Sequence, residues 1–378
     1  MSRYTKSLDP TNLGISLGRG FLPERDPLIT LPDNWEFLDQ FGKELPSLIK
    51  NGKIQEAARS LPIRDSDAME NLSESQRNRA MMIYGFGASA FIHSSKPSQT
   101  MLCRQLAIPL CRLSKQFGKP PILSYCSYAL NNWTRIDPFK DIAVDNLVLL
   151  QNFVELPDED WFILIHIDIE AKAAQAITRL LGSVLAAETG DSVAAYFHLE
   201  HAYKALDKMI ETLKRMPERC SMDVYFQTVR PWIMFFENVI YEGVEDLDGQ
   251  PQNFRGETGA QSSILPLLDG ALGIHHADSP LTKHLAEMRL YMPHNHRALL
   301  SEVENRSKIR GLVMRGPGHL KEVYNHCLER IYEFRDIHIG YANNYIHKKV
   351  ADPRGTGGTI FMPWLMQTRD ETRAALLK

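Results

Sequence analysis

LKEVYNHCLERIYEFRDIHIGYANNYIH, residues 320–347, carries a regular pattern of apolar and aromatic side chains. These side chains recur at alternating spacings of four and three residues, at Leu320, Tyr324, Cys327, Ile331, Phe334, His338, Tyr341 and Tyr345. The spacing places them on one face of a helix about 40 Å long, with Glu and Arg on the opposite face. We therefore predict one long amphipathic helix with a histidine on its apolar face.

This histidine, His338, has two interpretations. It is either a core imidazole that is hydrogen-bonded to a neighbour, or an axial ligand, because a neutral imidazole on a rigid helix is a common ligand of haem iron. The helix pattern alone leaves both open. The same choice applies to His166, which lies on the apolar face of a second stretch, residues 161–187. That stretch alternates like a strand at its start, but its continuation AKAAQAITRLLGSVLAA predicts one helix.

The rest of the chain is also helical in pattern, including residues 192–216 and 221–241. The predicted fold class is all-α, with at least ten helices. An acidic, mixed region ends near residue 160, so we place a domain boundary near residue 150. It separates a smaller N-terminal domain, residues 1–150, from a larger C-terminal bundle, residues 151–378.

Composition narrows the class of protein. A net charge of -3 and a pI near 6.5 leave no basic surplus for nucleic acid. No apolar run is long enough to span a bilayer, and the start of the chain lacks the apolar region of a secretory signal. The five cysteines are scattered, without a CxxC pair, which indicates reduced thiols. We expect a cytoplasmic protein whose partner is a small molecule, without nucleic acid or membrane.

The sequence contains no HExxH, GxSxG, phosphate loop or strand-led GxGxxG. The pairs His275–His276 and His294–His296 lie beside Gly, Asp, Pro and Asn, so we expect exposed loop histidines rather than metal ligands. Two other features have chemical potential. Arg230 shares an apolar helix face with Phe226, so its charge needs a partner, either an internal carboxylate or a ligand carboxylate. The run Gly355–Thr359 (GTGGT) either lets backbone amides approach a ligand or is a flexible linker.

Four blocks together resemble the indoleamine 2,3-dioxygenases, within the haem-dependent superfamily that cleaves tryptophan. The blocks are KPPILSYCSYALNNW (119–133), YFQTVRPW (225–232), FRDIHIGYANNYI (334–346) and PRGTGGTIFMPWLMQTRDET (353–372). The resemblance implies a large helical domain that binds haem b and a smaller domain that caps the distal pocket. It implies His338 as the proximal iron ligand and Arg335 near a haem propionate. Thr258 and Gly259 fall where the family has a small Ser-Ala pair beside the haem.

The resemblance also implies a substrate site. Arg230 matches the arginine that binds the substrate carboxylate, and Thr356 matches a threonine of the mobile Gly-rich loop. The implied aromatic residues are Phe226, which would stack on the indole, with Tyr225, and Tyr125 and Tyr128 of the distal wall. His166 stands where mammalian members have a serine, and it resembles the distal histidine of tryptophan 2,3-dioxygenases, which accepts the indole N–H. The link between His347 and Gly355 is shorter than in mammalian members.

The implied reaction inserts both atoms of O2 across the indole C2–C3 bond of L-tryptophan, giving N-formylkynurenine. His166 and Arg230 are its candidate catalytic residues. Two alternatives stay open: a haem-dependent oxygenase or ring-rearranging enzyme acting on another indole derivative in secondary metabolism, and a haem-binding protein without turnover.

Overall fold

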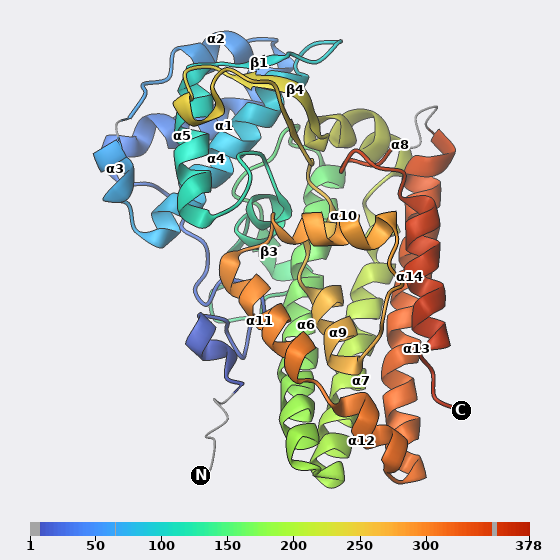
Figure 1. Cartoon of the computed structure of the whole chain (residues 1–378). Coiled ribbons are helices and arrows are strands. Elements are labelled where there is room, and N and C mark those ends of the chain that lie inside the picture. The colour runs from blue at the N-terminus through green and yellow to red at the C-terminus, as the bar shows by residue number, and fades with distance from the viewer. Residues whose placement is uncertain (1–7, 65, 350–353) are drawn as a thin grey trace.

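The structure is a computed structural model that describes residues 8–64, 66–349 and 354–378. It confirms the all-α prediction, since helices dominate the described chain and its strands are short. Four long helices run alongside one another in the larger part of the molecule (Figure 1): α6 (Pro157–Thr189), α7 (Ser192–Lys214), α13 (Gly318–Tyr341) and α14 (Met362–Ala374). Helix α7 packs against both α6 and α13, and α14 packs against α13. Shorter helices complete this bundle: α9 (Ile264–Leu272), α10 (Pro280–Arg289), α11 (His294–Arg306) and α12 (Ile309–Arg315).

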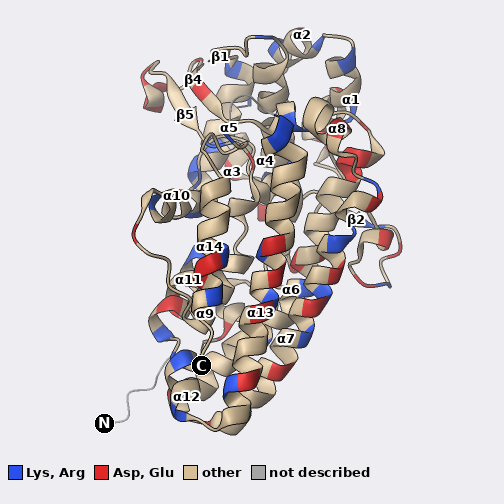
Figure 2. Ribbon diagram, turned by 90° about the vertical axis from the view of Figure 1, so that its right-hand side faces the viewer, with Lys and Arg blue, Asp and Glu red and all other residues tan. Residues whose placement is uncertain are grey.

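The N-terminal helices form a smaller layer at the upper left of Figure 1. They are α1 (Glu36–Lys50), α2 (Ile54–Arg59), α3 (Ser66–Glu70), α4 (Glu74–His93) and α5 (Arg104–Phe117). Every residue of α4 from Ala80 to Ile92 is buried, so this helix is the centre of the layer. A helix that is apolar all round has to be enclosed by its neighbours. Charged residues are spread over the outer sides of α6, α7 and α13 (Figure 2).

Helix α6 confirms the helical interpretation of residues 161–187. Pro157 stands in its first turn, followed by three acidic residues that favour a helix start, and Gly190 ends it in a left-handed conformation with φ +77°. No helix among the described residues has both the length and the apolar character needed to cross a bilayer.

The prediction of one helix over residues 221–241 is wrong for its second half. A short helix, α8 (Met222–Val224), leads into a π-helical turn at Tyr225–Val229 and a 3-10 turn at Arg230–Ile233. Pro231 offers no backbone N–H to continue the helix. The chain then becomes strand β4 (Phe236–Tyr241), which pairs in parallel with β1 (Met101–Leu102) and antiparallel with β5 (Gln252–Phe254). A second small sheet pairs β2 (Thr134–Arg135) with β3 (Leu147–Val148).

Strand β4 brings a part of the C-terminal half back to the N-terminal helices, because β1 precedes α5. The boundary near residue 150 stays a prediction. The carbonyl of Trp232 also accepts from the Ser89 hydroxyl of α4, and that of Met234 lies 3.2 Å from His93 Nε2. Residues 230–257 therefore pass from the larger bundle onto the N-terminal layer and back again.

Helix α13 confirms the helix predicted at residues 320–347, although its last part has a different geometry. A π-helical turn at Ala342–Ile346 and a 3-10 turn at His347–Lys349 follow Tyr341. The apolar face is buried from Leu320 to Ile331. It then becomes accessible at Phe334 and His338. The packing therefore loosens where the histidine lies. Residues 350–353, most of the link between His347 and Gly355, lie outside the described residues.

Candidate functional site

His338 faces an internal space. Its side chain keeps a large accessible surface. Nevertheless, desolvation by the surrounding protein lowers its pKa to about 4. Both observations hold together if the ring borders a hollow inside the protein rather than bulk water. No side chain or backbone group among the described residues is hydrogen-bonded to the imidazole. A neutral imidazole with a free nitrogen lone pair is the form that binds a metal.

His166 lies on α6 beside the same space. Its Nδ1 is 2.7 Å from the carbonyl oxygen of Phe162, so Nδ1 carries the proton that this oxygen accepts. Burial lowers the pKa of His166, which keeps the ring neutral and leaves Nε2 as an acceptor. Burial also lowers the pKa of His338, and the charge of His166 lowers it further. The two imidazoles are therefore close enough to interact electrostatically.

Tyr125 closes one side of His166, with ring centroids 6.1 Å apart. Its hydroxyl donates to Glu170 Oε1 at 3.0 Å, and the Ser262 hydroxyl donates to the same oxygen at 2.7 Å. The backbone N–H of Tyr125 donates to Gln261 Oε1 at 2.9 Å. Burial raises the pKa of Glu170 to about 7. This wall ties the smaller layer to α6. Sequence reasoning missed Glu170, Gln261 and Ser262, whose roles depend on contacts distant in sequence.

Tyr128 lies on a π-helical turn, Cys126–Leu130, and is buried. Its ring stacks on Phe86 of α4 with centroids 5.7 Å apart. Its hydroxyl has no hydrogen-bond partner among the residues that the structure describes. A buried hydroxyl without a partner is unfavourable by about 1–3 kcal/mol, so this group is available to a ligand.

Arg230 is buried at the start of the 3-10 turn. Its Nη2 donates to the carbonyl oxygen of Arg354 at 2.9 Å, and its guanidinium lies 5.6 Å from the centre of the Phe226 ring. The neighbouring Tyr225 packs on Phe162 with ring centroids 4.5 Å apart. The structure therefore brings Tyr225 next to the His166 side of the space, and Phe226 next to the arginine.

The Gly-rich run folds as a tight turn rather than an extended linker. Gly355 N–H donates to the carbonyl of Thr359 at 2.8 Å, and Gly358 N–H donates to that of Gly355 at 2.9 Å. Gly358 has φ +78°, a conformation that favours glycine. The turn is held against the segment 255–258, because Arg255 Nη1 donates to the Gly357 carbonyl at 3.2 Å. Arg255 is itself fixed by two bonds to Glu287, at 2.8 and 3.0 Å.

Gly256 makes the closest approach to this turn. A Cβ added to Gly256 would lie 2.5 Å from the Thr356 carbonyl oxygen and 2.6 Å from the carbonyl carbon of Met234. Thr356, with 8% of its surface exposed, is thus packed on Gly256. Thr258 lies beside Gly357, whose added Cβ would be 3.6 Å from Thr258 Cγ2. The turn, Arg230 and the segment 256–258 form one contiguous cluster.

Gly259 borders open space, since an added Cβ would meet no atom within 4 Å. The same is true of Gly340, two residues after His338. Arg335 is buried, and its Nη2 donates to Asp269 Oδ2 at 2.7 Å. Thr372 accepts a second bond from its guanidinium. Arg335 is therefore already paired with a protein carboxylate, and a haem propionate bound there would have to share it.

Asp269 also binds His276, and this overturns one expectation. His276 Nε2 lies 3.1 Å from Asp269 Oδ2, and its Nδ1 lies 2.6 Å from Glu371 Oε2. His296 is buried, with Nδ1 3.2 Å from the Ser263 hydroxyl. The prediction of an exposed loop histidine holds for His275, whereas His294 is exposed but begins helix α11, and the prediction is wrong for His276 and His296. Their tertiary partners are more than five residues away in sequence, so the local Gly and Pro content misled the prediction.

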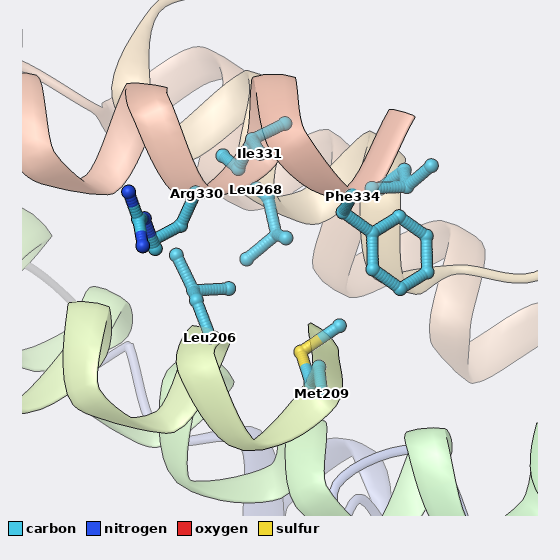
Figure 3. Close-up of a pocket in the computed structure, with 7 residues that line it drawn as sticks. Leu206, Met209, Leu268, Arg330, Ile331 and Phe334 are labelled. Atoms are coloured by element: carbon cyan, nitrogen blue, oxygen red, sulfur yellow. The ribbon is translucent and has the colours of Figure 1, made fainter. Parts of the chain in front are cut away.

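A small apolar pocket lies one turn before His338 on α13 (Figure 3). It is lined by Leu206, Met209, Leu265, Leu268, Arg330, Ile331 and Phe334, from α7, α9 and α13. The space open to a water-sized sphere is about 10 Å³, which is room for about one water molecule. The pocket does not include His338. One of its lining residues, the half-buried Phe334, belongs to the accessible part of the α13 face.

Several of these features fit an axial ligand of haem and a site beside it. His338 is neutral and has an unused nitrogen, and Gly259 has open space beside it that leaves room for a flat group. His166 offers a second neutral nitrogen from another helix. The Arg230 cluster supplies a cation and closely packed backbone at one end. The arrangement can hold a prosthetic group against His338 and a polar, anionic ligand end at Arg230.

Comparison with known proteins points to one family. A family model described as "Indoleamine 2,3-dioxygenase" matches residues 9–352. Indoleamine 2,3-dioxygenase 1 of Rattus norvegicus is 32% identical, over 93% of this chain and 92% of its own length. The 6-hydroxytryptophan 2,3-dioxygenase fscD of Fusarium equiseti is 29% identical, over 96% of each chain. Indoleamine 2,3-dioxygenase of Saccharomyces cerevisiae is 29% identical, over 95% and 92%. The chain therefore belongs to the indoleamine 2,3-dioxygenase family, whose members are dioxygenases of tryptophan and related indoles.

Proposed function

We propose that this protein is a haem-dependent dioxygenase that adds O2 across the indole C2–C3 bond of L-tryptophan, giving N-formylkynurenine. His338 would hold haem b, which supplies the activation of O2. The observation that carries the proposal is the pair of neutral imidazoles, His338 and His166, that border one internal space. The chain's own residues would bind and orient the substrate there.

His166 would accept the indole N–H through Nε2, because its Nδ1 proton is already committed to the Phe162 carbonyl. This bond fixes which edge of the ring faces His166 and therefore where C2 and C3 lie. Arg230 would bind the substrate carboxylate, for which a guanidinium offers charge-assisted hydrogen bonds. The turn at Thr356, packed on Gly256, would keep water from this end of the site.

A second candidate is a ring-substituted tryptophan. One relative is named a 6-hydroxytryptophan 2,3-dioxygenase. The buried Tyr128 hydroxyl, which lacks a partner among the described residues, favours this reading because a ring hydroxyl would supply one. Turnover of tryptophan and of hydroxytryptophans by the wild type and by Tyr128→Phe separates the two. Loss of turnover of the hydroxylated substrate alone would favour the second candidate.

The test is anaerobic reduction of the haem-loaded protein, followed by L-tryptophan and O2, with N-formylkynurenine measured by its near-ultraviolet absorbance. We expect product from the wild type and none from His338→Ala, with haem content measured for both. Haem uptake without O2 consumption would contradict the proposal in favour of a haem-binding protein without turnover. Product from His338→Ala at the wild-type rate would contradict the assignment of His338.

A further inference from the structure

Glu257 is a buried carboxylic acid whose side chain has no partner among the described residues. Only 4% of the surface of Glu257 is accessible to solvent. Its side chain forms no hydrogen bond or ion pair with any residue that the structure describes, and desolvation alone raises its pKa to about 8. The carboxyl oxygens of Glu257 are not completely shielded from solvent, unlike several other buried polar atoms that lack a partner. The small accessible surface of Glu257 therefore includes its carboxyl group, which opens onto an internal space.

The backbone around Glu257 belongs to the cluster at the polar end of the site. Its N–H donates to the carbonyl of Ile233 at 3.1 Å, on the turn that begins with Arg230. The preceding Gly256 touches Thr356, and its carbonyl accepts from Gln261 Nε2 at 3.0 Å. Glu257 is thus fixed beside Arg230 and the Gly-rich turn, on a segment that cannot easily move.

Three buried tyrosines lie near enough to Glu257 for its charge to affect them. Burial raises the pKa of Tyr125, Tyr128 and Tyr225, and the charge of Glu257 raises each further. For Tyr225 the charge of Arg230 acts in the opposite direction. Glu257 and Arg230 therefore both lie near Tyr225, on neighbouring segments of the same cluster. With Glu257 ionised, this carboxylate and the guanidinium would together be complementary to an amino-acid head group, in which an ammonium and a carboxylate share one carbon.

We propose that Glu257 binds the α-ammonium group of the substrate while Arg230 binds its carboxylate, so that Glu257 selects amino acids over other indoles. This inference rests on the proposed function. An isolated buried carboxylate is unfavourable, and an ammonium group supplies both the charge and the hydrogen-bond donors that the protein does not. A ligand without an amino group would leave the Glu257 carboxyl group buried and without a hydrogen-bond partner among the described residues.

The experiment compares three ligands that differ only at the head group. L-tryptophan has both charges, indole-3-propionate lacks the ammonium group, and tryptamine lacks the carboxylate. Dissociation constants would be measured by optical titration of the haem-loaded wild type, of Glu257→Gln and of the exposed control Glu245→Gln. Because a hydrogen bond to a charged group contributes about 1.5–3 kcal/mol, Glu257→Gln should weaken tryptophan about 10- to 100-fold. It should change indole-3-propionate less than twofold, and Glu245→Gln should change neither.

Steady-state kinetics give a second readout. Glu257→Gln should raise KM for tryptophan and leave kcat within about threefold, since the residue binds a group remote from the reacting bond. If Glu257→Gln weakens the binding of tryptophan and of indole-3-propionate equally, or weakens the binding of neither, the inference is overturned. Turnover of tryptophan by the wild type would still uphold the proposed function. If Glu257→Gln does not fold, the wild type alone decides: equal affinity for these two ligands overturns the inference. A wild type that binds and converts none of the ligands refutes the proposed function itself.

Discussion

Gly256→Ala is expected to separate the Gly-rich turn from the rest of the site. The added Cβ would lie 2.5 Å from the Thr356 carbonyl oxygen and 2.6 Å from the Met234 carbonyl carbon, whereas ordinary contact begins at 3.4 Å. The Cβ would approach the Ile233 carbonyl oxygen even more closely, and all three obstacles are backbone atoms, which cannot rotate away as a side chain does. The two segments must therefore move apart by nearly 1 Å. Overpacking of this kind destabilises a protein by about 1–3 kcal/mol.

The movement also has a functional expectation. The Arg230 bond to the Arg354 carbonyl, now 2.9 Å, would stretch beyond hydrogen-bonding distance, so KM for tryptophan should rise about tenfold or more. Urea unfolding measures the stability change, and steady-state kinetics measure KM. Gly318→Ala, at the exposed start of α13, is the matched control, because its Cβ would meet nothing within 4 Å. It should be neutral or stabilising by up to about 1 kcal/mol. A Gly256→Ala protein that matches the wild type in both stability and KM would refute the reasoning.

Three further outcomes are expected. Burial raises the pKa of Glu257 from 4.5 to about 8, so the folded state binds the proton more tightly. The proton bound at Glu257 contributes about 5 kcal/mol of stability at most, and this contribution is complete below pH 4.5 and lost as the pH rises through 8. Urea titrations between pH 5 and 9 should therefore show a smaller loss of stability for the Glu257→Gln protein than for the wild type. Asp269→Ala removes the acceptor of Arg335 and His276 and should destabilise by about 3–5 kcal/mol, and an effect below 1 kcal/mol would argue against a buried pair. Tyr125→Phe removes one of the two donors to Glu170 and should destabilise the protein by about 1–3 kcal/mol, as measured by thermal unfolding. Tyr332→Phe is the control and should cause no loss of stability, because the Tyr332 hydroxyl forms no hydrogen bond with the described residues.

The sequence predicted the elements whose information is local. Helices α6 and α13 follow from their apolar spacing, and His338 is placed by that spacing on the face that opens at its own position. Strand β4 was missed because its partners are two-residue and three-residue strands far away in the chain. A pairing of that length leaves almost no pattern in the partner sequence.

The candidate site was only partly accessible to sequence reasoning. Arg230 was found because a charge on an apolar face is conspicuous. Glu257 gave no such signal, since it lies in the polar loop sequence GETG, and its burial arises from contacts with distant segments. The hydrogen bond between His276 and Glu371 also gave no signal, because the two residues are 95 positions apart in the sequence.

Three π-helical turns contribute to the site: Cys126–Leu130, Tyr225–Val229 and Ala342–Ile346. Each carries one residue more per turn than an α-helix and is tolerated mainly where function maintains it. A π turn can revert to an α turn by losing a single residue, without disturbing the helices on either side. Single-residue deletions and insertions at these three places would rotate the pocket residues while the bundle stays intact. We therefore expect single-residue changes of length at these turns to alter the shape of the pocket, as substitutions of its lining would.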